Sequence, residues 1–157
     1  MVPFGLNQDQ FVAAYRRSLD YASKGAVTTI HGILAQPFGP GVDHAHVEIF
    51  ADEAGGAPSV WIYHSGKNNK VDRADQSIFP GKASELALDL KPLGDFDEKY
   101  FTDPETFPGT ELTVPLLARW FSECWWKAGG WFYPVPTTLT VHDYESFGST
   151  VLSEGGS

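Results

Sequence analysis

Three histidines and a glutamate lie close together in the sequence, in a pattern that could bind a metal ion. His44, His46 and Glu48 alternate along one segment, and His64 lies in the next segment of similar composition. Imidazole and carboxylate groups are ligands for zinc and iron. If the two segments pair as strands with Glu48 opposite His64, all four side chains share one face. That register predicts a small metal-dependent enzyme.

The hydrophobic pattern of the same two segments favours a different register. Shifting the pairing by one residue brings together their apolar positions, namely Val47, Ile49, Val60 and Ile62. Because successive side chains of a strand point to opposite faces, the shift moves His64 away from His44, His46 and Glu48. In this register the histidines form no cluster, and we expect no metal ion and no other cofactor.

Other residues with catalytic chemistry give weaker signals. His142 and Asp143 follow a predicted strand and could act as a general base with its orienting carboxylate, but neighbouring strand residues point to opposite faces. Cys124 is the only cysteine, and no family-type nucleophile signature surrounds it. The sequence contains no phosphate-binding glycine loop, no Gly-x-Ser-x-Gly turn and no His-Glu-x-x-His motif. These absences favour a non-catalytic protein.

An acidic and aromatic segment is the main candidate for binding a protein partner. Residues 89–111 contain seven acids and two lysines, a net charge of −5, together with Phe and Tyr residues. Pro and Gly residues predict a loop, and connections of about twenty residues without secondary structure are often functional. Carboxylates would steer a basic partner, and rings would supply buried contact. The alternative is an ordinary connection whose rings pack on the core. The predicted contact residues are Asp95, Asp97, Glu98, Tyr100, Asp103 and Glu105, with Trp126 as a further anchor.

Two helices would hold these residues in place. Apolar spacing predicts the first over residues 7–24, with Asn7 as N-cap and Gly25 as its end. The second is predicted from Thr113 to Gly129. Trp126 falls outside the apolar stripe of this second helix, so it is a candidate for partner contact. The stripe itself is predicted to be core: Leu117, Trp120, Phe121, Cys124, Trp125 and Ala128.

The remaining elements are predicted strands. Segments rich in β-branched and aromatic residues cover 27–34, 45–51, 60–65 and 137–141, and a weaker strand or short helix covers 83–90. We expect an α+β fold, with a mainly antiparallel sheet packed by the N-terminal helix and the Trp-rich C-terminal helix. The length of 157 residues fits a single domain, with a flexible tail from about residue 152.

Composition limits the class of partner. The net charge of −9 disfavours nucleic acid and anionic membrane as ligands and favours a basic protein. No apolar stretch approaches the roughly eighteen residues of a membrane-spanning helix. A single cysteine forms no intrachain disulfide, which predicts a cytoplasmic protein. The high aromatic content also leaves open a domain that binds a small apolar ligand, and the oligomeric state stays open too.

Two segments resemble bacterial immunity proteins of the polymorphic-toxin type. They are residues 120–125 with 128–130, WFSECW and AGG, and residues 142–147, HDYESF. The acidic charge and expected α+β fold are also similar to those of such proteins. The resemblance implies a protein that binds a cognate toxin and blocks its active site, with no chemistry of its own. Many such toxins are basic nucleases, which agrees with the negative charge of this chain.

Overall fold

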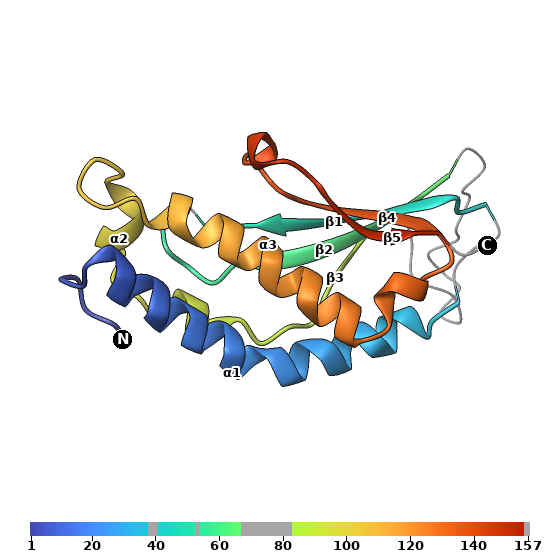
Figure 1. The fold of residues 1–157 in the computed structure, drawn as a ribbon, viewed down its shortest axis with the longest axis horizontal. Helices are drawn as coiled ribbons and strands as arrows, with labels where there is room; N and C mark the ends of the chain where they lie inside the picture. Colours follow the sequence, from blue (N-terminus) through green and yellow to red (C-terminus); the bar gives the residue numbers. More distant parts are fainter. Residues whose placement is uncertain (38–40, 53, 67–82, 156–157) are drawn as a thin grey trace.

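The computed structural model describes residues 1–37, 41–52, 54–66 and 83–155. In these residues one five-stranded sheet forms with the order β3-β2-β1-β4-β5. Figure 1 shows the long helices beside it. This confirms the predicted α+β fold. The elements in chain order are α1 (Gln8–Leu34), β1 (His44–Phe50), β2 (Ser59–Ser65), β3 (Ala83–Glu85), the 3-10 turn η1 (Lys91–Gly94), α2 (Lys99–Thr102), α3 (Gly109–Lys127), η2 (Gly130–Phe132), β4 (Pro136–Val141), η3 (Glu145–Phe147) and β5 (Thr150–Glu154).

The first helix, α1, is longer than the sequence pattern predicts. Its predicted start is confirmed, because Asn7 Oδ1 accepts a hydrogen bond from the Gln10 backbone N at 2.8 Å and Gln10 Oε1 accepts one from Asn7 N at 3.0 Å. The predicted end at Gly25 is wrong, and residues 27–34, predicted as a strand, continue the helix. Ile30 lies there with 0% exposure. Burial of this extended stripe outweighs the β-branched composition of the segment.

A substitution at Gly25 tests the continuous helix. A Cβ at this exposed position would meet no heavy atom within 4 Å. We expect Gly25→Ala to raise the free energy of unfolding by roughly 0.5–1 kcal/mol, because glycine loses more backbone entropy than alanine in a helix. Urea unfolding followed by circular dichroism measures the change. Gly129→Ala is the control that should destabilise, since Gly129 has a φ of 90°. A loss of stability in Gly25→Ala would contradict the continuous helix.

The hairpin of β1 and β2 adopts the register that the hydrophobic pattern favours. Val47 lies opposite Ile62, and Ala45 lies opposite His64. The face that carries Val47 is buried, whereas the opposite face of β1 is half-buried or exposed. We call this second surface the open face of the sheet. Strand β3 pairs antiparallel with β2, so only the first part of the predicted 83–90 element is a strand.

Strand β4 lies beside β1 and runs parallel to it. Residues 45–49 of β1 pair with residues 137–141 of β4, which brings the carboxyl ends of both strands to the same end of the sheet. Strand β5 then pairs antiparallel with β4. The predicted flexible tail is wrong as far as Glu154, because β5 extends to that residue and Leu152 is buried at 2% exposure.

Helix α3 carries the tryptophan stripe into the core. It begins at Gly109, earlier than the predicted Thr113. A Cβ at Gly109 would lie 2.1 Å from Tyr100 O, so only glycine allows this close approach of the two backbones. The predicted stripe is confirmed by the burial of all its members: Leu117, Trp120, Phe121, Cys124, Trp125 and Ala128.

Helices α1 and α3 lie side by side and run in the same direction (Figure 1). Midway along them, Trp120 Nε1 donates a hydrogen bond to Ser23 Oγ at 2.8 Å. Near their carboxyl ends, His31 Nδ1 lies 3.3 Å from Ala128 O. The two helices therefore present their amino ends at one end of the molecule and their carboxyl ends at the other.

The acidic segment 89–111 is ordered against α1. Its backbone forms η1, α2 and the first turn of α3. At centroid distances of 4.8 to 5.4 Å, the Phe11 ring of α1 contacts three rings of this segment, those of Phe96, Tyr100 and Phe107. Tyr100 has 0% exposure, and its hydroxyl donates a hydrogen bond to Pro3 O. The rings thus pack on the core, and the prediction that Tyr100 contacts a partner is wrong.

Candidate functional site

The predicted cluster of three histidines and Glu48 does not form. His64 lies on the buried face of the sheet with 1% exposure, and its Nε2 is 2.8 Å from the hydroxyl oxygen of Tyr133. Burial lowers the pKa of His64 to about 4, so its imidazole is neutral at neutral pH. The prediction of a metal site from His44, His46, Glu48 and His64 is therefore wrong, because the register separates His64 from the others.

The two remaining histidines of β1 bind neighbouring side chains. His44 Nδ1 lies 2.7 Å from Asp43 Oδ1 at the exposed start of the strand. His46 lies between two threonines of β4, with Nδ1 2.9 Å from Thr138 Oγ1 and Nε2 2.8 Å from Thr140 Oγ1. Burial lowers the pKa of His46, although the negative charge of Glu48 opposes that effect. His46 is thus a neutral cross-strand link on the open face.

Glu48 forms its hydrogen bond with the residue that follows β4 rather than with a residue of β2. His142 follows the last residue of β4, and its Nδ1 lies 3.2 Å from Glu48 Oε1. This hydrogen bond is the main cause of a raised pKa at His142. Glu145 joins them, since one ligand atom of each of the three residues lies within 4.8 Å of the others. Among the described residues, this is the group of histidine and carboxylate side chains that could hold a metal ion.

Sequence reasoning missed this group for a specific reason. His142 and Asp143 were paired with each other as neighbours in sequence, whereas the contact of His142 with Glu48 spans 94 residues. It depends on the parallel pairing of β1 with β4. The position of His142 directly after a predicted strand is the signal that could have indicated this group. A residue at the carboxyl end of a strand lies beside the ends of the neighbouring strands.

Cys124 does not supply a nucleophile. The side chain lies in the core of α3 with 2% exposure. Burial raises the pKa of its thiol to about 11, which outweighs the opposite effects of the Ser23 hydrogen bond and of Lys127. The thiol is therefore protonated at neutral pH, as expected for a small buried hydrophobe.

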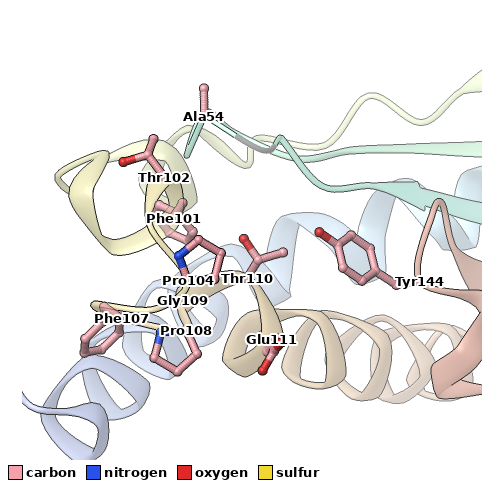
Figure 2. A pocket seen from close by; sticks show the side chains of 10 residues that line it. All are labelled: Ala54, Phe101, Thr102, Pro104, Phe107, Pro108, Gly109, Thr110, Glu111 and Tyr144. Atoms are coloured by element: carbon pink, nitrogen blue, oxygen red, sulfur yellow. The ribbon is translucent and has the colours of Figure 1, made fainter.

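A groove of about 450 Å³ opens beside the start of α3. Figure 2 shows Tyr144, from the connection between β4 and β5, pointing toward Thr110 and Glu111 of α3. Phe101 and Pro104 form the other end of this groove. A second groove of about 370 Å³ continues along α3 toward β5, and Tyr144 belongs to both. The lining of the first groove is mainly apolar, and Glu111 is the one charged side chain among its described residues.

The predicted acidic contact residues gather at the end of the molecule where α1 and α3 begin. We call Asp95, Asp97, Glu98, Asp103 and Glu105 the acidic end. Two of these carboxylates accept hydrogen bonds from their own backbone: Asp97 Oδ1 from Lys99 N at 2.9 Å, and Asp103 Oδ1 from Glu105 N at 3.2 Å. Asp103 Oδ2 also accepts a hydrogen bond from Thr106 Oγ1 at 2.7 Å. The Thr106 bond is the main cause of a lowered pKa at Asp103. The acidic end is therefore an exposed, negatively charged surface on an ordered backbone.

Trp126 lies far from the acidic end. Its indole is 67% exposed, in agreement with the predicted separation of Trp126 from the core stripe. It stands at the carboxyl end of α3, near the exposed Trp131 and Phe132 of η2. The acidic end lies at the other end of α3, roughly 27 Å away along a helix of this length. The structure thus divides the predicted partner-binding residues between two ends of the molecule.

Comparison with known proteins finds no matching family model, and no curated protein or solved structure matches the chain. None of the helices in the described part of the chain is both long and apolar enough to span a bilayer.

Proposed function

We propose that this protein is a non-catalytic binding protein that captures a basic protein at its acidic end, in the manner of cytoplasmic bacterial immunity proteins that neutralise a toxin. The observation that carries the proposal is the ordered backbone of the acidic end. The neighbouring rings of Phe96, Tyr100 and Phe107 are buried against α1. Four of the carboxylate residues are exposed, and Asp97 is half-buried. A surface that is already ordered loses little conformational entropy on binding, which favours affinity.

The charges around the acidic end support a basic partner. Asp9 and Glu111 lie in the first turns of α1 and α3, which begin at the same end of the molecule. Within segment 89–111, two lysines stand against seven acids. The N-terminal ammonium of Met1 lies 3.5 Å from Asp95 Oδ2 and offsets one further charge. A concentration of one sign of charge speeds encounter with the opposite charge and disfavours like-charged partners. We expect the association rate to fall steeply with salt.

The neighbouring groove supports a protein partner rather than a simple ion. Phe101 is half-buried and forms part of its wall beside Pro104. Protein interfaces combine a polar rim with a desolvated apolar centre. The acidic end would supply the rim, and the groove would accept an apolar or arginine side chain of the partner, with Glu111 available to pair with a positive charge.

Neutralising three exposed acids tests the acidic end. Asp95, Glu98 and Glu105 are suitable because Asp97 and Asp103 accept hydrogen bonds from the backbone. We expect the variant Asp95→Asn, Glu98→Gln, Glu105→Gln to bind the toxin domain encoded by the adjacent gene roughly 3- to 100-fold more weakly, since three exposed ion pairs of roughly 0.2–1 kcal/mol each sum to roughly 0.6–3 kcal/mol. Isothermal titration calorimetry at two salt concentrations measures the affinity and its salt dependence.

A charge-matched variant serves as the control. Asp20→Asn, Glu123→Gln, Glu154→Gln removes the same number of exposed carboxylates elsewhere on the molecule. It should retain the affinity of the wild type. Equal affinities and equal salt dependence for the two triple variants would exclude the acidic end as the binding surface, and failure of the wild type to bind would exclude the proposed partner.

A further inference from the structure

Three side chains with metal-binding chemistry meet at the carboxyl ends of β1 and β4. We propose that Glu48, His142 and Glu145 form a binding site for one divalent transition-metal ion of the zinc class. Glu48 comes from β1, His142 directly follows β4 and Glu145 comes from η3. No part of the proposed protein-binding function requires this site, so it is an additional property of the molecule.

The distances between the donor atoms suit an ion of this size. Glu48 Oε1 and His142 Nδ1 are 3.2 Å apart, and Glu145 offers an oxygen within 4.8 Å of both. A zinc ion with ligands at about 2.0–2.2 Å holds neighbouring ligands roughly 3.4 Å apart in a tetrahedron. Small rotations of the Glu145 side chain would therefore complete the set, and the ion would replace the proton between Glu48 and His142.

The other ring nitrogen of His142 faces a carboxylate at ion-pair distance. His142 Nε2 lies 3.5 Å from Asp143 Oδ1. A carboxylate beside one ring nitrogen favours the tautomer that carries its proton there, which leaves the lone pair of the other nitrogen for the metal. At His142 that second nitrogen is Nδ1, which faces Glu48. Once the ion displaces the proton on Nδ1, Asp143 is therefore placed to serve as the outer partner of His142.

The sheet holds two of the three ligands in position. The backbone N of His142 donates a hydrogen bond to Ile49 O at 2.8 Å, which ties the end of β4 to β1. The Phe50 ring lies against the His142 imidazole at a centroid distance of 4.7 Å. The Glu48 side chain is only 19% exposed. Because these groups are already placed, binding would cost little side-chain entropy.

The donor set selects the class of metal. One imidazole nitrogen and two carboxylates suit zinc and its transition-metal neighbours, whereas magnesium and calcium prefer oxygen ligands alone. Two ionised glutamates balance the charge of a divalent ion. Three protein ligands leave at least one coordination position for water or for an atom of a bound partner.

Calorimetry on the full chain tests the site directly. The protein is purified without a histidine tag, treated with chelator, and titrated with zinc chloride and separately with magnesium chloride. We expect one zinc ion per chain and no comparable magnesium binding. His142→Gln and Glu145→Gln should each weaken zinc binding by more than the roughly 10–100-fold that loss of an outer partner costs. Asp143→Asn should cause that smaller loss, and asparagine tolerates the φ of 64° at this position.

A second histidine provides the control. His44 is exposed beside Asp43 and could bind zinc adventitiously. His44→Gln should leave the affinity and the stoichiometry unchanged. The proposal is overturned if wild-type protein binds no zinc, if His142→Gln and Glu145→Gln bind as tightly as the wild type, or if His44→Gln abolishes binding. The melting temperature is an independent readout: zinc should raise that of the wild type and leave that of His142→Gln unchanged.

Discussion

Replacing Trp125 with alanine should lower the free energy of unfolding by about 3–5 kcal/mol, the usual cost of truncating a buried aromatic side chain. Trp125 is 1% exposed, and its ring packs against Phe121 and Tyr133. Its Nε1 donates a hydrogen bond to Leu152 O at 3.1 Å, which links α3 to β5. Alanine would leave a cavity and remove that link at once. Urea unfolding with tryptophan fluorescence or circular dichroism measures the loss.

The adjacent residue is a matched control for this substitution. Trp126→Ala removes the same side chain one position later, where 67% of it is exposed. The expected change is within about 0.5 kcal/mol, as for most surface substitutions. Similar losses at the two positions would contradict the division of α3 into a buried stripe and an exposed face.

Acidification should destabilise the protein through His64. Its pKa is lowered from 6.5 to about 4 in the folded protein because the imidazole is buried. Between these values the unfolded chain binds a proton that the folded chain does not, so stability falls as the pH decreases from 6.5 to 4. The full difference in pKa corresponds to at most about 3 kcal/mol. Above pH 6.5 His64 contributes no further change.

The variant His64→Gln isolates this contribution. Glutamine can still form a hydrogen bond with the Tyr133 hydroxyl but does not titrate in this range. The difference in unfolding free energy between wild type and variant should therefore shrink by up to about 3 kcal/mol on going from pH 7 to pH 4. Subtracting the free energy of unfolding of the variant from that of the wild type at each pH removes the contributions of other groups. One of these is His142, whose raised pKa acts in the opposite direction. A pH-independent difference would show that His64 titrates normally.

Short-range patterns in the sequence predicted much of the fold. Asn7 and Gln10 form the capping box that begins α1, and the tryptophan stripe of α3 is buried as its spacing indicates. The apolar positions of β1 and β2 also predicted the correct register of the hairpin. In each case the deciding residues lie within one element or in two consecutive ones. The exception is 27–34, where β-branched residues suggested a strand and burial against the rest of the core kept them helical.

The candidate site could not be predicted in the same way. Contact between Glu48 and His142 requires that β4 lie beside β1 and run parallel to it. No local pattern in the sequence predicts that pairing. Tyr100 was misplaced for a similar reason. Its burial depends on the N-terminal residues around Pro3 and on Phe11, which are distant in sequence. An aromatic residue in a polar segment gives no sign of which distant surface it will cover.

The parallel pairing of β1 with β4 also determines when the protein can fold during synthesis. His46 and its partner Thr138 are 92 residues apart, so at roughly 5–20 residues per second β1 emerges from the ribosome about 5–20 s before β4. During that interval one edge of β1 has no strand beside it, and unpaired edges invite association with other chains. We expect a nascent chain that stops before residue 136 to expose this edge and the apolar face of the hairpin. Such an incomplete chain would therefore be more prone to associate with other chains than the complete protein.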